Sequence, residues 1–317
     1  MIRSKRMYDV CFRALQGLPL PARALTKLLI ESIIARLIST EQVVVCCYVW
    51  MANHPHMQLF SLDSTVLTQF HGRLKKRLSD FLKRLLGLPH LSLWDDRTTL
   101  GEVLDLEEAI NRIVYSFLNP VRAGLVRSID EYKGCNTWKE FISAPATLHA
   151  VVEKEVPWIF ATDIEPLSNR NPSWSEERGV IDDLLQKAAG RQTHTLRIHP
   201  FRWLQAFGIS DPTQIEAIRA RIVARVRQEE ARLAPPKAPL QRIEGFLVTD
   251  EYIPTKKERK VFMYGSSVQV RTAHLNLYRA FIDKCARCYE LMKKGVKAIP
   301  WPPGCFIPPA PQLCNAM

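Results

Sequence analysis

The stretch "QVVVCCYVW", Gln42 to Trp50, carries the strongest strand signal in the chain, because β-branched and aromatic residues dominate it. The residues "MAN" then turn the chain, and a second extended segment follows from His54 to Phe60. Apolar spacing predicts a helix on each side of this pair, over about 24–40 and over 65–85. Two adjacent strands between two helices favour an antiparallel sheet with helices packed on it.

Flanking elements extend this pattern. A strand is predicted over Tyr8–Leu15, and a helix from Asp105 to about Asn119, with Asp105 as its N-cap and Pro120 at its end. The intervening "GLPHLSLWDDR" is interpreted as irregular. The order β-α-β-β-α-α predicts the α+β fold class, as an antiparallel sheet with helices on one face.

The 317 residues suffice for one large domain or two ordinary ones. We expect a first domain over residues 1–145 and a linker over 146–175, which contains three prolines and several charges. A basic, mainly helical region of no evident chemistry is expected over 176–317. Its helices are predicted after Asp211, with Pro212 at the first position, and from about Ser267 to Lys294.

The net charge of +12 points either to a polyanionic partner, usually nucleic acid, or to a merely basic surface. The eight cysteines are irregularly placed, and adjacent Cys46 and Cys47 suit buried thiols better than a disulfide framework. Cys285 and Cys288 are also interpreted as core thiols. No signal peptide or membrane span is evident, so a reduced, cytoplasmic compartment is expected.

The two histidines after the turn lie one residue apart, so on a strand they point to one face. Two neutral imidazoles can bind one divalent ion, although an isolated pair is more often two ordinary polar histidines at a strand end. On the helix that begins at Asp105, Tyr115 lies opposite the apolar stripe and Asn119 lies one turn later. This pair suits either a nucleophile beside a ligand or an ordinary exposed tyrosine and amide.

These residues form recognisable motifs. "YVWMANHPHMQLF", Tyr48–Phe60, resembles the His-hydrophobic-His (HUH) motif of single-strand DNA transposases with one catalytic tyrosine, and most closely that of REP-associated tyrosine transposases. "IVYSFLNPVRAGLV", Ile113–Val126, resembles their tyrosine block, and "LWDDR", Leu93–Arg97, resembles the element between the two. The resemblance covers roughly residues 5–140. Ala52, Pro55 and Ser116 depart from the common pattern without removing a functional group.

The resemblance implies a ferredoxin-like HUH domain in which His54, His56 and Asn119 bind Mg²⁺ or Mn²⁺ and Tyr115 is the nucleophile. It implies a metal-dependent transposase that cleaves and rejoins single-stranded DNA beside REP-like hairpins through a 5′-phosphotyrosine. Such a protein would be bacterial, cytoplasmic and nucleoid-associated, and a monomer or homodimer.

Candidate DNA contacts come mainly from the basic helix and the motifs. Trp94 and Tyr48 could stack on bases, although Trp94 also suits a core position. The predicted nucleic-acid-binding residues are Lys75, Lys76, Arg77, Lys83, Arg84, Trp94, Arg97 and Arg122.

Three other functions stay open. A domesticated hairpin-binding regulator would keep the basic surface without needing all four site residues. An HUH nickase for plasmid replication or mobilisation would share the chemistry, but the tyrosine block favours the transposase branch. A structural metal-binding protein fits the charge least.

Overall fold

The computed structural model describes residues 2–15, 17–40, 42–63, 66–233, 245–246, 261–296, 298–305 and 307, with the backbone alone for residues 96–98. The strands are β1 (Arg6–Ala14), β2 (Val43–Trp50), β3 (Pro55–Ser61), β4 (Trp94–Val103), β5 (Val152–Val156), β6 (His194–Ile198) and β7 (Met263–Tyr264). The α-helices are α1 (Ala24–Ile38), α2 (Val66–Leu86), α3 (Leu106–Arg122), α4 (Trp138–Ser143), α5 (Trp174–Ala188), α6 (Pro212–Arg232) and α7 (Val268–Lys293). Short 3-10 helices are η1 (Ile129–Glu131), η2 (Ala161–Asp163) and η3 (Arg202–Phe207).

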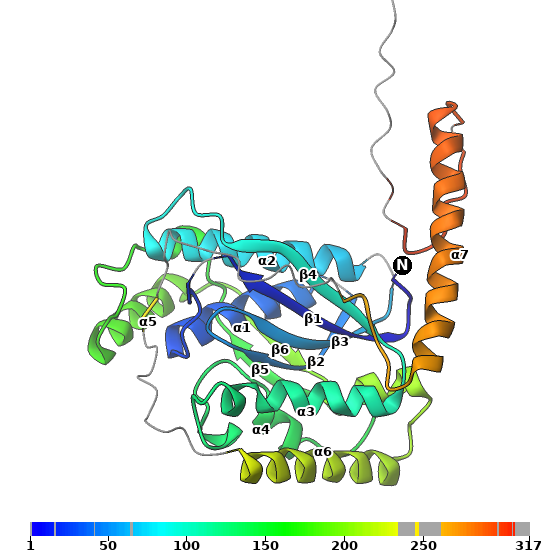
Figure 1. Ribbon diagram of the computed structural model, residues 1–317. Coiled ribbons are helices and arrows are strands. Elements are labelled where there is room, and N and C mark those ends of the chain that lie inside the picture. Colours follow the sequence, from blue (N-terminus) through cyan, green and yellow to red (C-terminus); the bar gives the residue numbers. More distant parts are fainter. Residues whose placement is uncertain are drawn as a thin grey trace, which may run out of the picture.

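The central sheet has the strand order β2-β3-β1-β4-β7 (Figure 1). β1 pairs antiparallel with β3 and β4, β2 pairs antiparallel with β3, and only β7 joins parallel, on β4. The order β1-α1-β2-β3-α2-β4 in the chain, with β2-β3-β1-β4 in space, is the ferredoxin-like arrangement. The predicted α+β class with a mainly antiparallel sheet is confirmed.

The alternation of side chains along β1 divides the core into two layers. Val10 and Phe12 pack with the apolar faces of α1 and α2. Met7, from the opposite face of β1, packs with α3. The sheet therefore has helices on both faces, whereas the sequence predicted helices on one face only. The second face is covered by α3, since α1 and α2 pack on the first (Figure 1).

Two predicted element boundaries were wrong. Residues 94–103, partly expected to be irregular, form β4 between β1 and β7. The segment carries charges and threonines and has little apolar alternation, so its strand character comes from pairing on both sides. The predicted helix end at Asn119 was also too early, since α3 continues through Pro120 to Arg122. Pro120 lies two positions before the last residue of α3, and because it has no N–H, the helix loses one backbone hydrogen bond there.

The segment 146–175 is part of the fold and not an extended linker. It contains β5, which pairs antiparallel with β6, and it buries Val156, Ile159 and Ile164 in the layer of α1 and α2. Its prolines mark turns between these contacts, which composition alone could not distinguish from a linker. The division of the chain into domains stays a prediction.

The region after residue 176 is helical, as expected, but also supplies β6 and β7. α6 lies along α3 and buries Ile215, Ile222 and Val226 against it (Figure 1). α7 projects away from the sheet and buries only His274 and Cys288 along its length. Cys285 is half-buried, with its Sγ 3.3 Å from that of Cys305.

Among the described helices, none combines the length and apolar character that crossing a bilayer requires.

Candidate active site

The two motif histidines lie on the face of the sheet that α3 covers. Along β3, Met57 and Leu59 point into the layer of α1 and α2. His56 and Gln58 therefore point the other way, and Gln58 donates a 2.8 Å hydrogen bond to Ser116 of α3. The rings of His54 and His56 lie 5.1 Å apart between centroids, nearly perpendicular. The expected shared face of the pair is thus present.

The surroundings keep both imidazoles neutral. Burial lowers the pKa of His54 to about 3, with smaller contributions from His56 and Arg13. Burial also lowers the pKa of His56 to about 3, helped by Arg112 and Arg13. Nδ1 of His54 lies 2.6 Å from Oδ1 of Asn53, an oxygen that accepts from the Nδ1–H tautomer, which keeps the lone pair on Nε2. A neutral imidazole with a free lone pair is the form that binds a metal.

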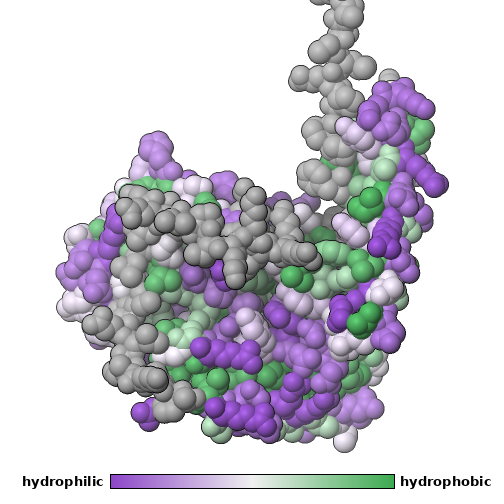
Figure 2. All heavy atoms as spheres, viewed as in Figure 1, coloured by the Kyte–Doolittle hydropathy of each residue, from purple (hydrophilic) through white to green (hydrophobic). Residues whose placement is uncertain are grey.

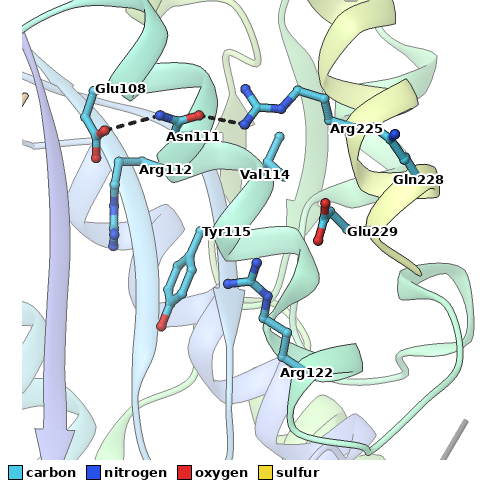
Figure 3. Close-up of a pocket in the computed structure, with 9 residues that line it drawn as sticks. All are labelled: Glu108, Asn111, Arg112, Val114, Tyr115, Arg122, Arg225, Gln228 and Glu229. Atoms are coloured by element: carbon cyan, nitrogen blue, oxygen red, sulfur yellow. Dashed lines mark hydrogen bonds between the residues drawn. The ribbon is translucent and has the colours of Figure 1, made fainter. Parts of the chain in front are cut away.

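Tyr115 lies directly against this pair. Its ring packs edge-on to that of His56, with centroids 5.3 Å apart. Two guanidinium groups flank the same ring: the carbon of Arg112 lies 4.7 Å from the ring centroid and that of Arg122 lies 5.3 Å from it (Figure 3). The sequence placed Tyr115 on the polar side of an amphipathic helix, and the fold turns that side toward β3.

Asn119 lies one helical turn beyond Tyr115 and is buried. Its amide Nδ2 has no hydrogen-bond partner in the described part of the chain, and neither does Nδ1 of His56. Amide oxygen and nitrogen exchange places by rotating the side chain, so this position can equally present an oxygen. Unpaired buried polar atoms are uncommon in folded proteins. Five other buried side-chain atoms in the described residues also have no partner, so what distinguishes His56 and Asn119 is their place beside Tyr115, where a metal ion would fit.

The third ligand of the candidate metal site would have to be the amide oxygen of Asn119. Within the described ranges, no three side chains of His, Cys, Asp or Glu come together to hold a metal. Two imidazole nitrogens and one amide oxygen leave positions open for other oxygen ligands, and this mixed set suits Mn²⁺ or Mg²⁺.

Sequence reasoning missed a buried network behind Tyr115. Asp9 of β1 is fully buried and accepts hydrogen bonds from Arg112 at 3.0 and 2.6 Å and from Gln58 Nε2 at 2.6 Å. Burial raises the pKa of Asp9, and Arg112 opposes that shift. The network fixes Arg112 beside the Tyr115 ring. Asp9 is the one carboxylate in β1, among buried apolar residues, and that was the available signal.

The predicted DNA contacts on α2 lie apart from Tyr115, on the opposite layer. Lys75 donates to the backbone oxygen of Asp95 at 3.2 Å, and Lys76 pairs with Asp80 at 2.9 Å. The pKa of Arg77 is lowered by burial and by Arg73. Lys83 and Arg84 line a separate hollow between α2 and η2.

Trp94 and Tyr48, the residues predicted to stack on bases, pack against other side chains of the protein. The ring of Trp94 lies edge-on to Phe12, 4.8 Å between centroids, and its Nε1 donates to the backbone oxygen of Lys75. Tyr48 is only 1% exposed, so the prediction that it stacks on bases was wrong. The strand that holds it is covered by α1 and α2. The side chain of Arg97 lies outside the described residues.

A pocket of about 330 Å³ lies beside Tyr115, between α3 and α6 (Figure 3). Its walls combine arginines with acidic and amide side chains from both helices. Hydrophilic side chains also dominate the surrounding face over α3 and α6 (Figure 2).

No protein-family model matches the chain, and no curated protein matches it. Among solved structures, a REP-associated tyrosine transposase bound to a REP hairpin is similar, with a TM-score of 0.39 and 11% identity. The match covers 45% of this chain and 82% of that one. A TM-score of this size does not establish a shared family, so the function proposed below rests on the site and its motifs.

Proposed function

We propose that this protein is a metal-dependent DNA strand transferase of the HUH class, which cleaves and rejoins single-stranded DNA beside a hairpin. The observation that carries the proposal is the packing of Tyr115 against His56, next to a second neutral imidazole. A phenol that packs against one neutral imidazole, with a second beside it, is an arrangement for covalent phosphoryl transfer. The REP-associated motifs in their usual order support the same class.

The reaction balances without an outside energy source. The Tyr115 phenol gives up its proton and its oxygen attacks the scissile phosphorus. The phosphorus–3′-oxygen bond breaks, and the departing 3′-oxygen takes up one proton to become a free 3′-hydroxyl. The remaining strand stays on the protein as a 5′-phosphotyrosine ester. A second 3′-hydroxyl then attacks the ester, forms a new phosphodiester bond and returns the proton to the phenol.

Each site residue has a separate role in this proposal. His54, His56 and Asn119 would hold Mg²⁺ or Mn²⁺, which when bound polarises the scissile phosphate and neutralises its charge. Arg112, fixed by Asp9, and Arg122 hold the Tyr115 ring between them. Guanidinium groups in this position also attract the phosphate backbone toward the phenol.

The test is formation of a covalent protein–DNA adduct. Labelled single-stranded oligonucleotides with hairpins from the DNA flanking the gene are mixed with protein and Mn²⁺ and separated on a denaturing gel. We expect an adduct with the native protein, none with Tyr115→Phe, and none in EDTA. Tyr264→Phe is the matched control, since the Tyr264 ring also lies against Arg112, 4.2 Å from its guanidinium carbon, but comes from β7 and not from the helix that holds Tyr115.

An adduct that persists in Tyr115→Phe would remove Tyr115 as the nucleophile. Tight hairpin binding without any adduct would instead favour the hairpin-binding regulator.

A further inference from the structure

The pocket between α3 and α6 offers a place for part of the DNA strand itself. Its volume of about 330 Å³ falls within the range of small-ligand sites and is large for a gap filled only by water. The ring of Tyr115 forms part of its wall, and the same ring contacts His56. A strand whose scissile phosphate meets the phenol therefore has its neighbouring nucleotide within reach of this pocket.

Three arginines from the two helices line the pocket, together with the carboxylates of Glu108 and Glu229. Arg112 and Arg122 come from α3, and Arg225 comes from α6 (Figure 3). Arg122 forms no ion pair within the described part of the chain. Arg112 uses Nε and Nη2 on Asp9, which leaves Nη1 without a partner among the residues described. Free guanidinium N–H groups beside a cavity suit a phosphate, which they bind at two oxygens.

The arginine from α6 is held in place before any ligand arrives. Arg225 donates to Glu107 at 3.2 Å and to Oδ1 of Asn111 at 2.7 Å, so both ends of its guanidinium are fixed to α3. Glu229 is the acidic residue on the α6 wall, and Arg232 pairs with it at 3.0 Å. The pocket is thus preorganised, which lowers the entropy cost of binding.

We propose that this pocket binds the sugar–phosphate unit adjoining the scissile phosphate, so that α6 helps to place the cleaved linkage. The proposal rests on the strand-transferase function proposed above. It assigns a role to α6, which lies outside the roughly 5–140 range of the motif resemblance. The chemical class of the ligand is a nucleotide unit of single-stranded DNA, recognised through its backbone phosphate.

The test adds one negative charge at the pocket and the same charge elsewhere on the same helix. Gln228 lines the pocket, whereas Gln214 lies fourteen residues earlier on α6, about 21 Å away along its axis. Gln228→Glu and Gln214→Glu change net charge equally, so they share any long-range effect. Thermal melting of both variants checks that each is folded.

The Kd of each variant is measured by fluorescence anisotropy with a hairpin oligonucleotide, in EDTA so that binding is read without cleavage. We expect Gln228→Glu to raise Kd about fivefold and Gln214→Glu to raise it less than about twofold. The reason is that the charge at position 228 faces the bound phosphate, where solvent and salt screen it least. Uncharged methylphosphonate linkages are then introduced one at a time. At one linkage adjoining the cleavage site, the penalty of Gln228→Glu should disappear.

Equal effects of the two variants would overturn the pocket assignment, and so would a penalty that no single linkage removes. Both results can occur while the native protein still forms its Tyr115 adduct, which would leave the proposed function standing. Conversely, a linkage-specific effect without an adduct would support the pocket and contradict strand transfer. Absence of any DNA binding would contradict both.

Discussion

At the scale of single residues, the site is defined by groups whose burial leaves them neutral or unpaired. His54 and His56 are neutral imidazoles at neutral pH, and Nδ1 of His56 has no partner within the described ranges. Leaving such an atom buried is costly unless something binds there. In the proposed function, a divalent ion would supply that interaction.

Removing either imidazole should therefore weaken metal binding. We expect His54→Ala and His56→Ala each to lower Mn²⁺ affinity at least about tenfold in isothermal titration, as the loss of one ligand does. His71→Ala is the matched control, because His71 is half-buried and lies against Phe12 in the opposite layer. Equal loss in the His71 variant, or retained affinity in the other two, would contradict the ligand assignment.

Which site residues the sequence could predict depends on how far apart they lie in the chain. The spacing of His54 and His56 on a strand, and of Tyr115 and Asn119 on a helix, fixes their relative directions locally. The bond between Asp9 and Arg112 joins residues 103 positions apart and depends on the register of the sheet against α3. No local pattern contains that information.

At the scale of elements, α6 is attached to α3 by apolar packing and by ion pairs, and the two contribute unequally to stability. Ile222 is fully buried against α3. Glu107 accepts from Arg221 at 2.6 Å and from Arg225 at 3.2 Å, but its side chain is 45% exposed. Exposed ion pairs contribute little to stability, because water screens them.

The two interactions can be separated by mutation. We expect Ile222→Ala to lower the free energy of unfolding by about 2 to 4 kcal/mol, since it removes buried methyl groups and leaves a cavity. Glu107→Gln should cost less than about 1 kcal/mol. Urea unfolding measures both. A larger loss from Glu107→Gln than from Ile222→Ala would show that charge, not packing, holds α6.

The elements that the sequence predicted are those with strong periodicity. The strands β2 and β3 and the helices α1 to α3 were expected within a few residues. β4 and β5 were missed because polar residues fill them, and pairing with β1 and β6 makes them strands.

At the scale of the whole molecule, the buried histidines couple stability to pH. Burial lowers the folded-state pKa of His54 and His56 to about 3 and that of His71 to about 4. In the unfolded chain each titrates near its ordinary value of about 6.5. Between these values the unfolded state binds more protons, so stability must fall as pH falls.

The expected change is large enough to measure. Each of these histidines should remove about 2 kcal/mol of unfolding free energy between pH 7 and pH 5. Urea unfolding at both pH values, in EDTA to exclude metal binding, gives the difference, and His71→Gln should reduce it by about 2 kcal/mol. Equal stability at the two pH values would contradict the neutral, buried state of the histidines.

The arrangement of the later segments was the least predictable feature at this scale. Segments 146–175 and 212–232 contribute core residues to both layers, yet their composition resembles a linker and a solvated basic helix. Several arginines of α6 form ion pairs with acidic residues, among them Arg221 with Glu107 and Arg227 with Asp130. Such contacts between distant segments leave no periodic pattern in the sequence.

In the proposed reaction Tyr115 carries the DNA, and the sequence around it allows a direct measurement. Trypsin cleaves after Arg112 and Arg122, which releases Ile113–Arg122, a peptide with Tyr115 as its one tyrosine. After nuclease and trypsin digestion of the adduct, mass spectrometry should find nucleotides attached to this peptide, and fragmentation should place them on Tyr115. Nucleotides on any other peptide, such as Val261–Arg271 with Tyr264, would contradict the account.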